Sequence, residues 1–176
     1  MFRKFEDRTE AGWKLAEALT AYDGKEDTLV MALPRGGVPI AYEVAEALSL
    51  PLDIWLVRKL GVPGQEELAM GAIAMNGTCY TNENIILNMG VHEEQVDQVI
   101  AKEKEELQRR NELYRGNRPV MPVKGKTVII VDDGLATGAT MHVAIESLRQ
   151  AGAAVIVAAV PVGEASACEE LLKIAD

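Results

Sequence analysis

The stretch that most constrains the fold of this chain runs from Val128 to Thr140. Four consecutive β-branched residues, Val128–Val131, are typical of a strand that is buried on both faces of a sheet. Asp132 and Asp133 follow directly, at the end of the strand where open α/β sheets bind their ligands. Helical periodicity begins near Ala139, so the order predicts a strand, a ligand-binding loop and a helix.

The loop between this strand and helix has the composition of a phosphate-binding site. Its backbone N–H groups and the hydroxyls of Thr137 and Thr140 converge at a helix N-terminus, where an anion is stabilised. Ionised Asp132 and Asp133 only accept hydrogen bonds, so they suit the hydroxyls of a ribose cis-diol. A buried strand, a solvated Asp-Gly turn and a helix cap would explain each piece alone. The complete order favours a sugar-phosphate site.

A second strand, loop and helix are predicted earlier in the chain. Thr28–Leu33 reads as a buried strand, a helix follows over residues 38–48, and Pro34-Arg35-Gly36-Gly37 lies between them. Glycines let the backbone approach a ligand closely, and the Arg35 guanidinium is a bidentate donor for phosphate. An ordinary tight turn explains the two glycines equally well.

A third strand is predicted at Leu52–Arg58, ending on the cations Arg58 and Lys59. Two cations at a strand end suit pyrophosphate, although such cations are usually just solvated. The segment Leu60–Leu68, with its glycines, proline and Glu66-Glu67, predicts a mobile lid loop.

The remaining segments complete an alternation of strands and helices. We predict a capping box at Asp7–Glu10 that begins a first helix ending near residues 22–24, and a short hairpin or strand pair at Thr78–Asn88. A long charged helix is predicted at His92–Arg115, followed after the phosphate helix by a strand at 153–160 and a helix at 165–175. The fold class is therefore α/β, a parallel twisted sheet with helices on both faces. Its three ligand loops lie at strand carboxyl ends, so we expect them to share one crevice.

The sequence resembles the type I phosphoribosyltransferase family, whose signature is an apolar strand, two acids, a short loop and Thr-Gly-x-Thr. Val128–Thr140 matches this signature without a gap. The chain is most similar to bacterial stand-alone phosphoribosyltransferase-domain proteins of unassigned substrate. The family binds 5-phosphoribosyl-1-pyrophosphate (PRPP), and the resemblance implies that Asp132 and Asp133 hold its ribose hydroxyls. It places the 5′-phosphate on Ala136, Thr137, Gly138, Ala139 and Thr140. It places pyrophosphate on Arg35, Gly36 and Gly37, where the family loop often has a non-proline cis peptide, so we expect irregular backbone around Arg35–Gly36.

The resemblance implies an enzyme that transfers the phosphoribosyl group of PRPP to a nitrogenous base and releases pyrophosphate. Its catalytic candidates are Arg58 and Lys59, with Glu66 and Glu67 of the predicted lid. Mg²⁺ is expected to bind through PRPP, without a direct protein ligand. Hypoxanthine-guanine enzymes carry an acidic general base where this chain has Ala136, so their route is not expected here. The alternative is a PRPP-sensing regulatory or binding module without turnover.

The length of 176 residues predicts a single phosphoribosyltransferase-like domain spanning the chain. Its end at Asp176 suggests that a C-terminal strand and base-contacting tail are lacking. Either the chain is a shortened form, or base recognition is built elsewhere, such as from the N-terminal segment and residues 78–115. The family often dimerises, so a homodimer is an open alternative to a monomer.

Composition excludes several other classes of function. The net charge of −9 and the pI of about 4.8 argue against a nucleic-acid partner. With no apolar run of 18 or more residues and no secretory leader, we expect a cytoplasmic protein without membrane contact. Cys79 and Cys168 fit no metal spacing and are expected to be reduced thiols. No Gly-rich nucleotide loop of the P-loop or dinucleotide type follows a strand, which argues against a PRPP-synthetase-like or dinucleotide enzyme. The partners that the resemblance implies are PRPP and a nucleobase.

Overall fold

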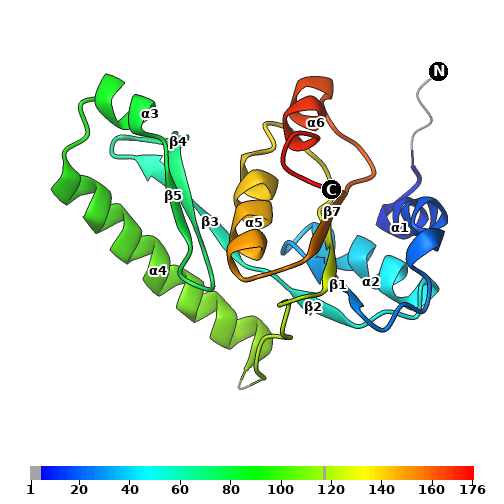
Figure 1. Cartoon of the computed structure of the whole chain (residues 1–176). Helices are drawn as coiled ribbons and strands as arrows, with labels where there is room; N and C mark the ends of the chain where they lie inside the picture. Colours follow the sequence, from blue (N-terminus) through cyan, green and yellow to red (C-terminus); the bar gives the residue numbers. More distant parts are fainter. Residues whose placement is uncertain (1–4, 117) are drawn as a thin grey trace. The chain divides into compact units, whose positions relative to one another are not determined.

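The computed structural model describes residues 5–116 and 118–176 (Figure 1). The chain forms two compact units. Unit 1 comprises Met1–Trp55 and Val120–Asp176, and unit 2 comprises Leu56–Pro119. Each unit has its own sheet, and the two are described separately below.

Unit 1 is built on a four-stranded parallel sheet with the strand order β2-β1-β6-β7. The strands are β1 (Thr28–Ala32), β2 (Leu52–Ile54), β6 (Thr127–Val131) and β7 (Val155–Ala159). The β-branched run at the end of β6 is fully buried, as a central strand covered on both faces requires. The predicted α/β class and parallel sheet are confirmed.

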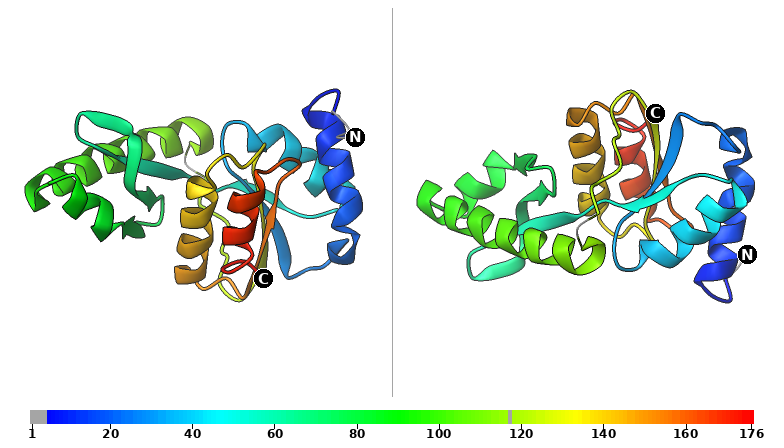
Figure 2. Two further views of the ribbon diagram at one scale, coloured as in Figure 1. Left: turned by 90° about the horizontal axis from the view of Figure 1, so that it is seen from above. Right: turned by 90° about the horizontal axis from the view of Figure 1, so that it is seen from below.

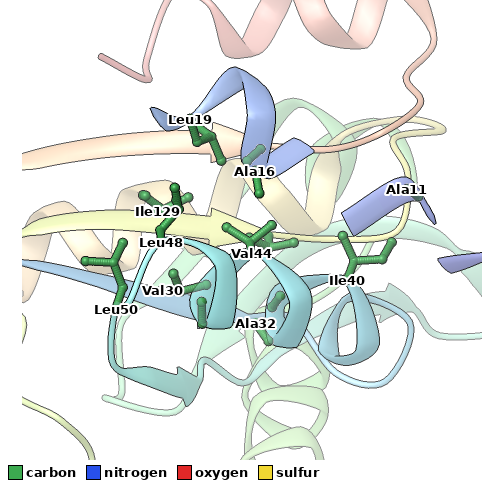
Figure 3. Close-up of a cluster of buried hydrophobic side chains, with 14 residues drawn as sticks. Ala11, Ala16, Leu19, Val30, Ala32, Ile40, Val44, Leu48, Leu50 and Ile129 are labelled. Carbon is green, nitrogen blue, oxygen red and sulfur yellow. The ribbon is translucent and has the colours of Figure 1, made fainter. Parts of the chain in front are cut away.

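Helices cover both faces of this sheet. On one side lie α1 (Arg8–Ala18) and α2 (Gly37–Ala47), and on the other lie α5 (Ala139–Gln150) and α6 (Ala165–Leu171), as Figure 2 shows. Figure 3 shows the core under α1 and α2, where Ala16 and Val44 pack with Val30 and Ile129 of the sheet. The helices begin and end close to the predicted positions. A short 3-10 turn, η1 (Thr20–Tyr22), follows α1.

The predicted third strand is shorter than expected, because β2 ends at Ile54. Trp55 is buried next to it, where its indole Nε1 donates to Ser147 Oγ on α5 at 2.7 Å. Trp55 also donates its backbone N–H to Ala32 O at 2.9 Å. This anchor ends the strand, and the chain then leaves the parallel sheet. Arg58 and Lys59 therefore do not lie at the carboxyl end of a parallel strand, which corrects the prediction.

Unit 2 contains a three-stranded antiparallel sheet and two helices. The strands β3 (Val57–Val62), β4 (Gln65–Ala74) and β5 (Cys79–Thr81) pair in that order, followed by α3 (Glu83–Asn88) and α4 (Glu93–Arg115). The loop predicted at Leu60–Leu68 is wrong: these residues form a hairpin in which Val62 pairs with Gln65. Its two-residue turn uses Gly64 at φ +80°, a conformation that favours glycine.

The other predictions for unit 2 are partly confirmed. Cys79–Thr81 is a strand, but the rest of the predicted strand pair is helix α3, begun by an N-cap in which Asn82 Oδ1 accepts from Ile85 N at 3.2 Å. The long charged helix is confirmed as α4, with His92 as its N-cap. None of the helices in the described part of the chain is long and apolar enough to cross a bilayer.

Candidate functional site

The loops that follow β1 and β6 meet at the carboxyl end of the parallel sheet. Their strands are neighbours, with Ala32 paired to Val131, and Leu33 donates its N–H to Val131 O at 2.9 Å. A Cβ atom on Gly36 would lie 2.2 Å from Asp133 Oδ2, closer than any real contact. A Cβ on Gly37 would lie 2.5 Å from Val131 O. Gly36 thus lies against the Asp133 side chain and Gly37 against the β6 backbone, so the predicted pyrophosphate loop packs directly on the predicted ribose acids.

The backbone of the first loop is irregular, as expected. The peptide bond between Pro34 and Arg35 is cis, and Gly36 is helical at φ −61° just before α2. The Arg35 side chain is exposed. The loop thus presents a guanidinium to solvent beside a short segment of bare backbone.

The two acids after β6 lie in different environments. Asp132 is partly buried, and its Oδ1 accepts the backbone N–H of Asp133 at 2.8 Å. The pKa of Asp132 is raised to about 6, mainly by burial. The negative charge of Asp133 contributes to the rise, and the hydrogen bond from the Asp133 backbone N–H opposes it. Asp133 instead has a cationic partner, since its Oδ2 accepts from Arg8 Nη2 at 2.8 Å. The adjacent carboxylates therefore differ in burial and in charge compensation.

The second loop continues into the N-terminus of α5. Gly138 is the N-cap residue at φ +72°, where an L side chain would be strained. Ala136 and Thr137 are exposed, and Ala139 and Thr140 are partly buried in the first turn. Thr137 Oγ1 lies 3.5 Å from Ala139 N, as a weak acceptor. Because the first N–H groups of a helix lack intrahelical acceptors, the start of α5 offers backbone donors to an anion.

The segment after β7 supports this loop from the side. Leu135 donates its N–H to Val162 O at 3.0 Å, and Glu164 donates to Leu135 O at 2.9 Å. Leu135 and Gly163 form an isolated parallel bridge. The phosphate loop is thus held by backbone of the segment after β7.

A groove of about 650 Å³ opens beside Asp133. It is lined by residues 5–9 and Ala11 at the start of α1, by Pro39 and Ile40 of α2, and by Pro161–Val162 after β7. Arg8 also lines this groove, and the ligand-binding motifs of the sequence do not predict a role for it. No local sequence signal marks it, because Arg8 and Asp133 are 125 residues apart in sequence.

The remaining predicted site residues lie in unit 2. Arg58, on β3, donates from Nε to Glu103 Oε2 of α4 at 2.7 Å, while Lys59 is exposed on the same strand. Glu66 and Glu67 are exposed at the start of β4. Of the three predicted ligand loops, those after β1 and β6 are brought together in unit 1, and a role for the four unit 2 residues stays a prediction. Among residues 5–116 and 118–176, no group of three or more His, Cys, Asp or Glu side chains forms a metal cage.

Comparison with known families agrees with this geometry. The family of the phosphoribosyl transferase domain matches residues 9–175. The chain belongs to this family.

Individual relatives place the chain within it. A Mycobacterium tuberculosis (strain H37Rv) protein named "Putative phosphoribosyl transferase Rv0571c" is 46% identical over 159 residues, covering 90% of this chain and 36% of that protein. The chain therefore spans about a third of the length of the curated relatives it matches. The crystal structure of TT1426 from Thermus thermophilus is 40% identical with a TM-score of 0.84, covering 99% of this chain and 82% of that one. A purine phosphoribosyltransferase from Pyrococcus horikoshii shares the fold at 21% identity and a TM-score of 0.51, covering 91% of this chain and 75% of its own.

Proposed function

We propose that the protein binds PRPP at the meeting point of the β1 and β6 loops and transfers its phosphoribosyl group to a nitrogenous base, releasing pyrophosphate. The observation that carries the proposal is the direct packing of Gly36 on the Asp133 carboxylate. It brings a loop suited to pyrophosphate against acids suited to a ribose diol. Membership of the phosphoribosyl transferase domain family supports the same function.

In this proposal each part of the site binds one part of PRPP. The N–H groups and hydroxyls of residues 136–140 hold the 5′-phosphate at the start of α5, where the helix dipole favours an anion. Asp132 and Asp133 accept hydrogen bonds from the ribose hydroxyls. Gly36, Gly37 and the exposed Arg35 hold the pyrophosphate, because bare backbone and a guanidinium both donate to phosphate oxygens.

Catalysis would follow from stabilising the charge that develops as pyrophosphate leaves. Arg35 offers a cation within unit 1, and we propose that Arg58 and Lys59 of unit 2 add to it. Arg58 is already paired with Glu103, so exposed Lys59 is the stronger candidate of the two. Glu66 and Glu67 stay catalytic candidates, as exposed carboxylates at the start of β4.

We propose that Mg²⁺ arrives with PRPP. The donor set fits this, because two adjacent carboxylates without a closed cage among the described residues suit an ion that takes most ligands from phosphate and water. When bound, Mg²⁺ would offset the negative charge of the pyrophosphate group. Asp132 and Asp133 are assigned to the ribose hydroxyls, so the ion would take its oxygen ligands from PRPP and water.

The groove beside Asp133 is the space in unit 1 that we assign to the acceptor. It adjoins the carboxylate that would hold the ribose, so an acceptor there would lie near the sugar. Its walls combine the apolar side chains of Pro39 and Val162 with charged groups at the start of α1. Mixed walls of this kind suit a planar nitrogen heterocycle with polar edges.

The test is release of pyrophosphate from PRPP in the presence of Mg²⁺, screened over purine and pyrimidine bases one at a time. Release that depends on one base, with formation of its nucleotide, is the expected result. PRPP binding without release for any base would support the PRPP-sensing module instead. Release at the same rate without a base would be hydrolysis and would contradict the proposed transfer.

A further inference from the structure

We propose that Arg8, the first residue of α1, is a positioning residue that holds the Asp133 carboxylate where it receives the ribose hydroxyls. This inference rests on the proposed function and adds a residue that belongs to none of the predicted ligand-binding motifs. The contact is direct, with Arg8 Nη2 donating to Asp133 Oδ2 at 2.8 Å across 125 residues of sequence.

The Asp133 carboxylate is confined from two sides. Gly36 lies against it so closely that a Cβ there would be 2.2 Å from Oδ2 and 2.7 Å from Oδ1. Arg8 binds Oδ2 as well. An ionised carboxylate has about four acceptor positions, so one bond to Arg8 leaves room for hydroxyl donors. Arg8 and a ribose can therefore share Asp133, and the Arg8 contact restricts the carboxylate to one orientation.

Helix stability does not explain an arginine at this position. A cation in the first turn of a helix opposes the helix dipole, which favours acidic residues there. The stabilising groups at this end are Asp7, whose Oδ1 accepts from Glu10 N at 2.9 Å, and Glu10, whose Oε2 accepts from Glu6 N at 2.6 Å. The Arg8 side chain is 59% exposed, so its ion pair adds little to folding. Its contact with Asp133 accounts for its placement.

The support behind Arg8 is firm. Helix α1 packs so tightly on α2 that a Cβ on Gly12 would lie 2.6 Å from Glu43 Cβ. Ala11 and Ala16 are buried in the core shown in Figure 3. Because α2 itself starts at Gly37, the helix that carries Arg8 is fixed to the element that carries the pyrophosphate loop. Such preorganisation of a binding group lowers the cost of ordering it when the ligand binds.

The experiment is calorimetric titration of PRPP with Mg²⁺ into four forms of the protein: wild type, Arg8→Ala, Arg8→Lys and Lys14→Ala. Lys14 is the matched control, since it is a cation on the same helix that pairs with Glu17 at 2.7 Å and not with Asp133. We expect Arg8→Ala to weaken PRPP binding about two- to fivefold, the range of an exposed ion pair. Arg8→Lys should restore part of the loss, and Lys14→Ala should bind as wild type does. Thermal unfolding of all four forms checks that each is folded.

A second arm separates positioning from general electrostatics. In an Asp133→Asn background, Arg8→Ala should cause no further loss, because the carboxylate that it positions is gone. An equal loss in both backgrounds would overturn the inference, as would wild-type affinity of Arg8→Ala. Tighter binding by Arg8→Ala would show that Arg8 competes with ribose, and would also overturn it. Absence of PRPP binding by wild-type protein would refute the proposed function itself, whereas the preceding outcomes refute only the role of Arg8.

Discussion

Replacing Gly36 by alanine tests the junction of the two loops most sharply. The backbone at Gly36, at φ −61° and ψ −37°, suits alanine, so the substitution introduces no conformational strain. The new Cβ would lie 2.2 Å from Asp133 Oδ2, and ordinary contact begins at 3.4 Å. The carboxylate must therefore retreat by about 1.2 Å, the difference between these two distances. Because the end of a side chain can move, we expect the variant to fold. Its Asp133 carboxylate would no longer lie where it accepts the ribose hydroxyls.

The expected loss is large for binding and small for stability. Losing a hydrogen bond to a charged group costs about 1.5–3 kcal/mol, so PRPP affinity should fall about 10- to 150-fold. The Arg8–Asp133 pair is worth about 0.2–1 kcal/mol at an exposed site. Replacing glycine by alanine at a compatible position stabilises a protein by about 0.4–1 kcal/mol, because it lowers the conformational entropy of the unfolded chain. The melting temperature should therefore change by no more than about 3 °C.

Gly37→Ala is the matched control, because its Cβ would lie 2.5 Å from the backbone oxygen of Val131, which cannot retreat cheaply. Overpacking of this kind costs about 1–3 kcal/mol, so the melting temperature should fall by about 2–12 °C. Calorimetric titration of PRPP and thermal unfolding are measured on both variants. Wild-type PRPP affinity in a folded Gly36→Ala protein would refute the assignment of Asp133 to the ribose.

Three further predictions concern the charged groups. Arg35→Ala should weaken binding of pyrophosphate more than of ribose 5-phosphate in calorimetric titrations, and an equal loss for both would remove Arg35 from the pyrophosphate loop. Burial raises the pKa of Asp132 from 3.8 to about 6, so this carboxyl stabilises the fold below pH 3.8 and that stability is lost as pH rises through about 6. Asp132→Asn should thus be more stable than wild type at pH 7.5 in denaturant unfolding, and lower stability would contradict the burial argument. The variant should also bind PRPP more weakly. Its PRPP affinity should rise less than that of wild type as the pH increases through about 6. Lys59→Ala should lower the rate of pyrophosphate release more than it lowers PRPP affinity, by steady-state kinetics and titration, and an unchanged rate would exclude Lys59 from leaving-group stabilisation.

The parallel sheet and its two ligand loops could be predicted because the signals are local. Val128–Val131 is β-branched throughout and is buried throughout, and the acids follow where the strand ends. The Gly36–Gly37 pair lies between a strand and a helix, which predicts a close approach of the backbone to another group but does not identify that group. The structure supplies the partner, which is Asp133 for the first glycine and the β6 backbone for the second.

The errors at β2 and in unit 2 also have physical causes. Leu52–Arg58 reads as one apolar run, and only tertiary structure shows that Trp55 inserts beside Ser147 and ends β2 early. Glycine, proline and acidic residues in Leu60–Leu68 are typical of a loop, but the pairing of β3 with β4 draws them into a hairpin with a two-residue turn. The role of Arg8 could not be predicted, because its partner Asp133 is 125 residues away in sequence.

Calorimetric titration of PRPP into the wild-type protein decides whether unit 1 carries a PRPP site. The titration is run with and without Mg²⁺, beside ribose 5-phosphate and ATP as competing phosphate ligands. We expect Mg²⁺-dependent binding that is tighter for PRPP than for ribose 5-phosphate or ATP. A folded protein that binds PRPP no better than ATP would contradict a PRPP site in unit 1.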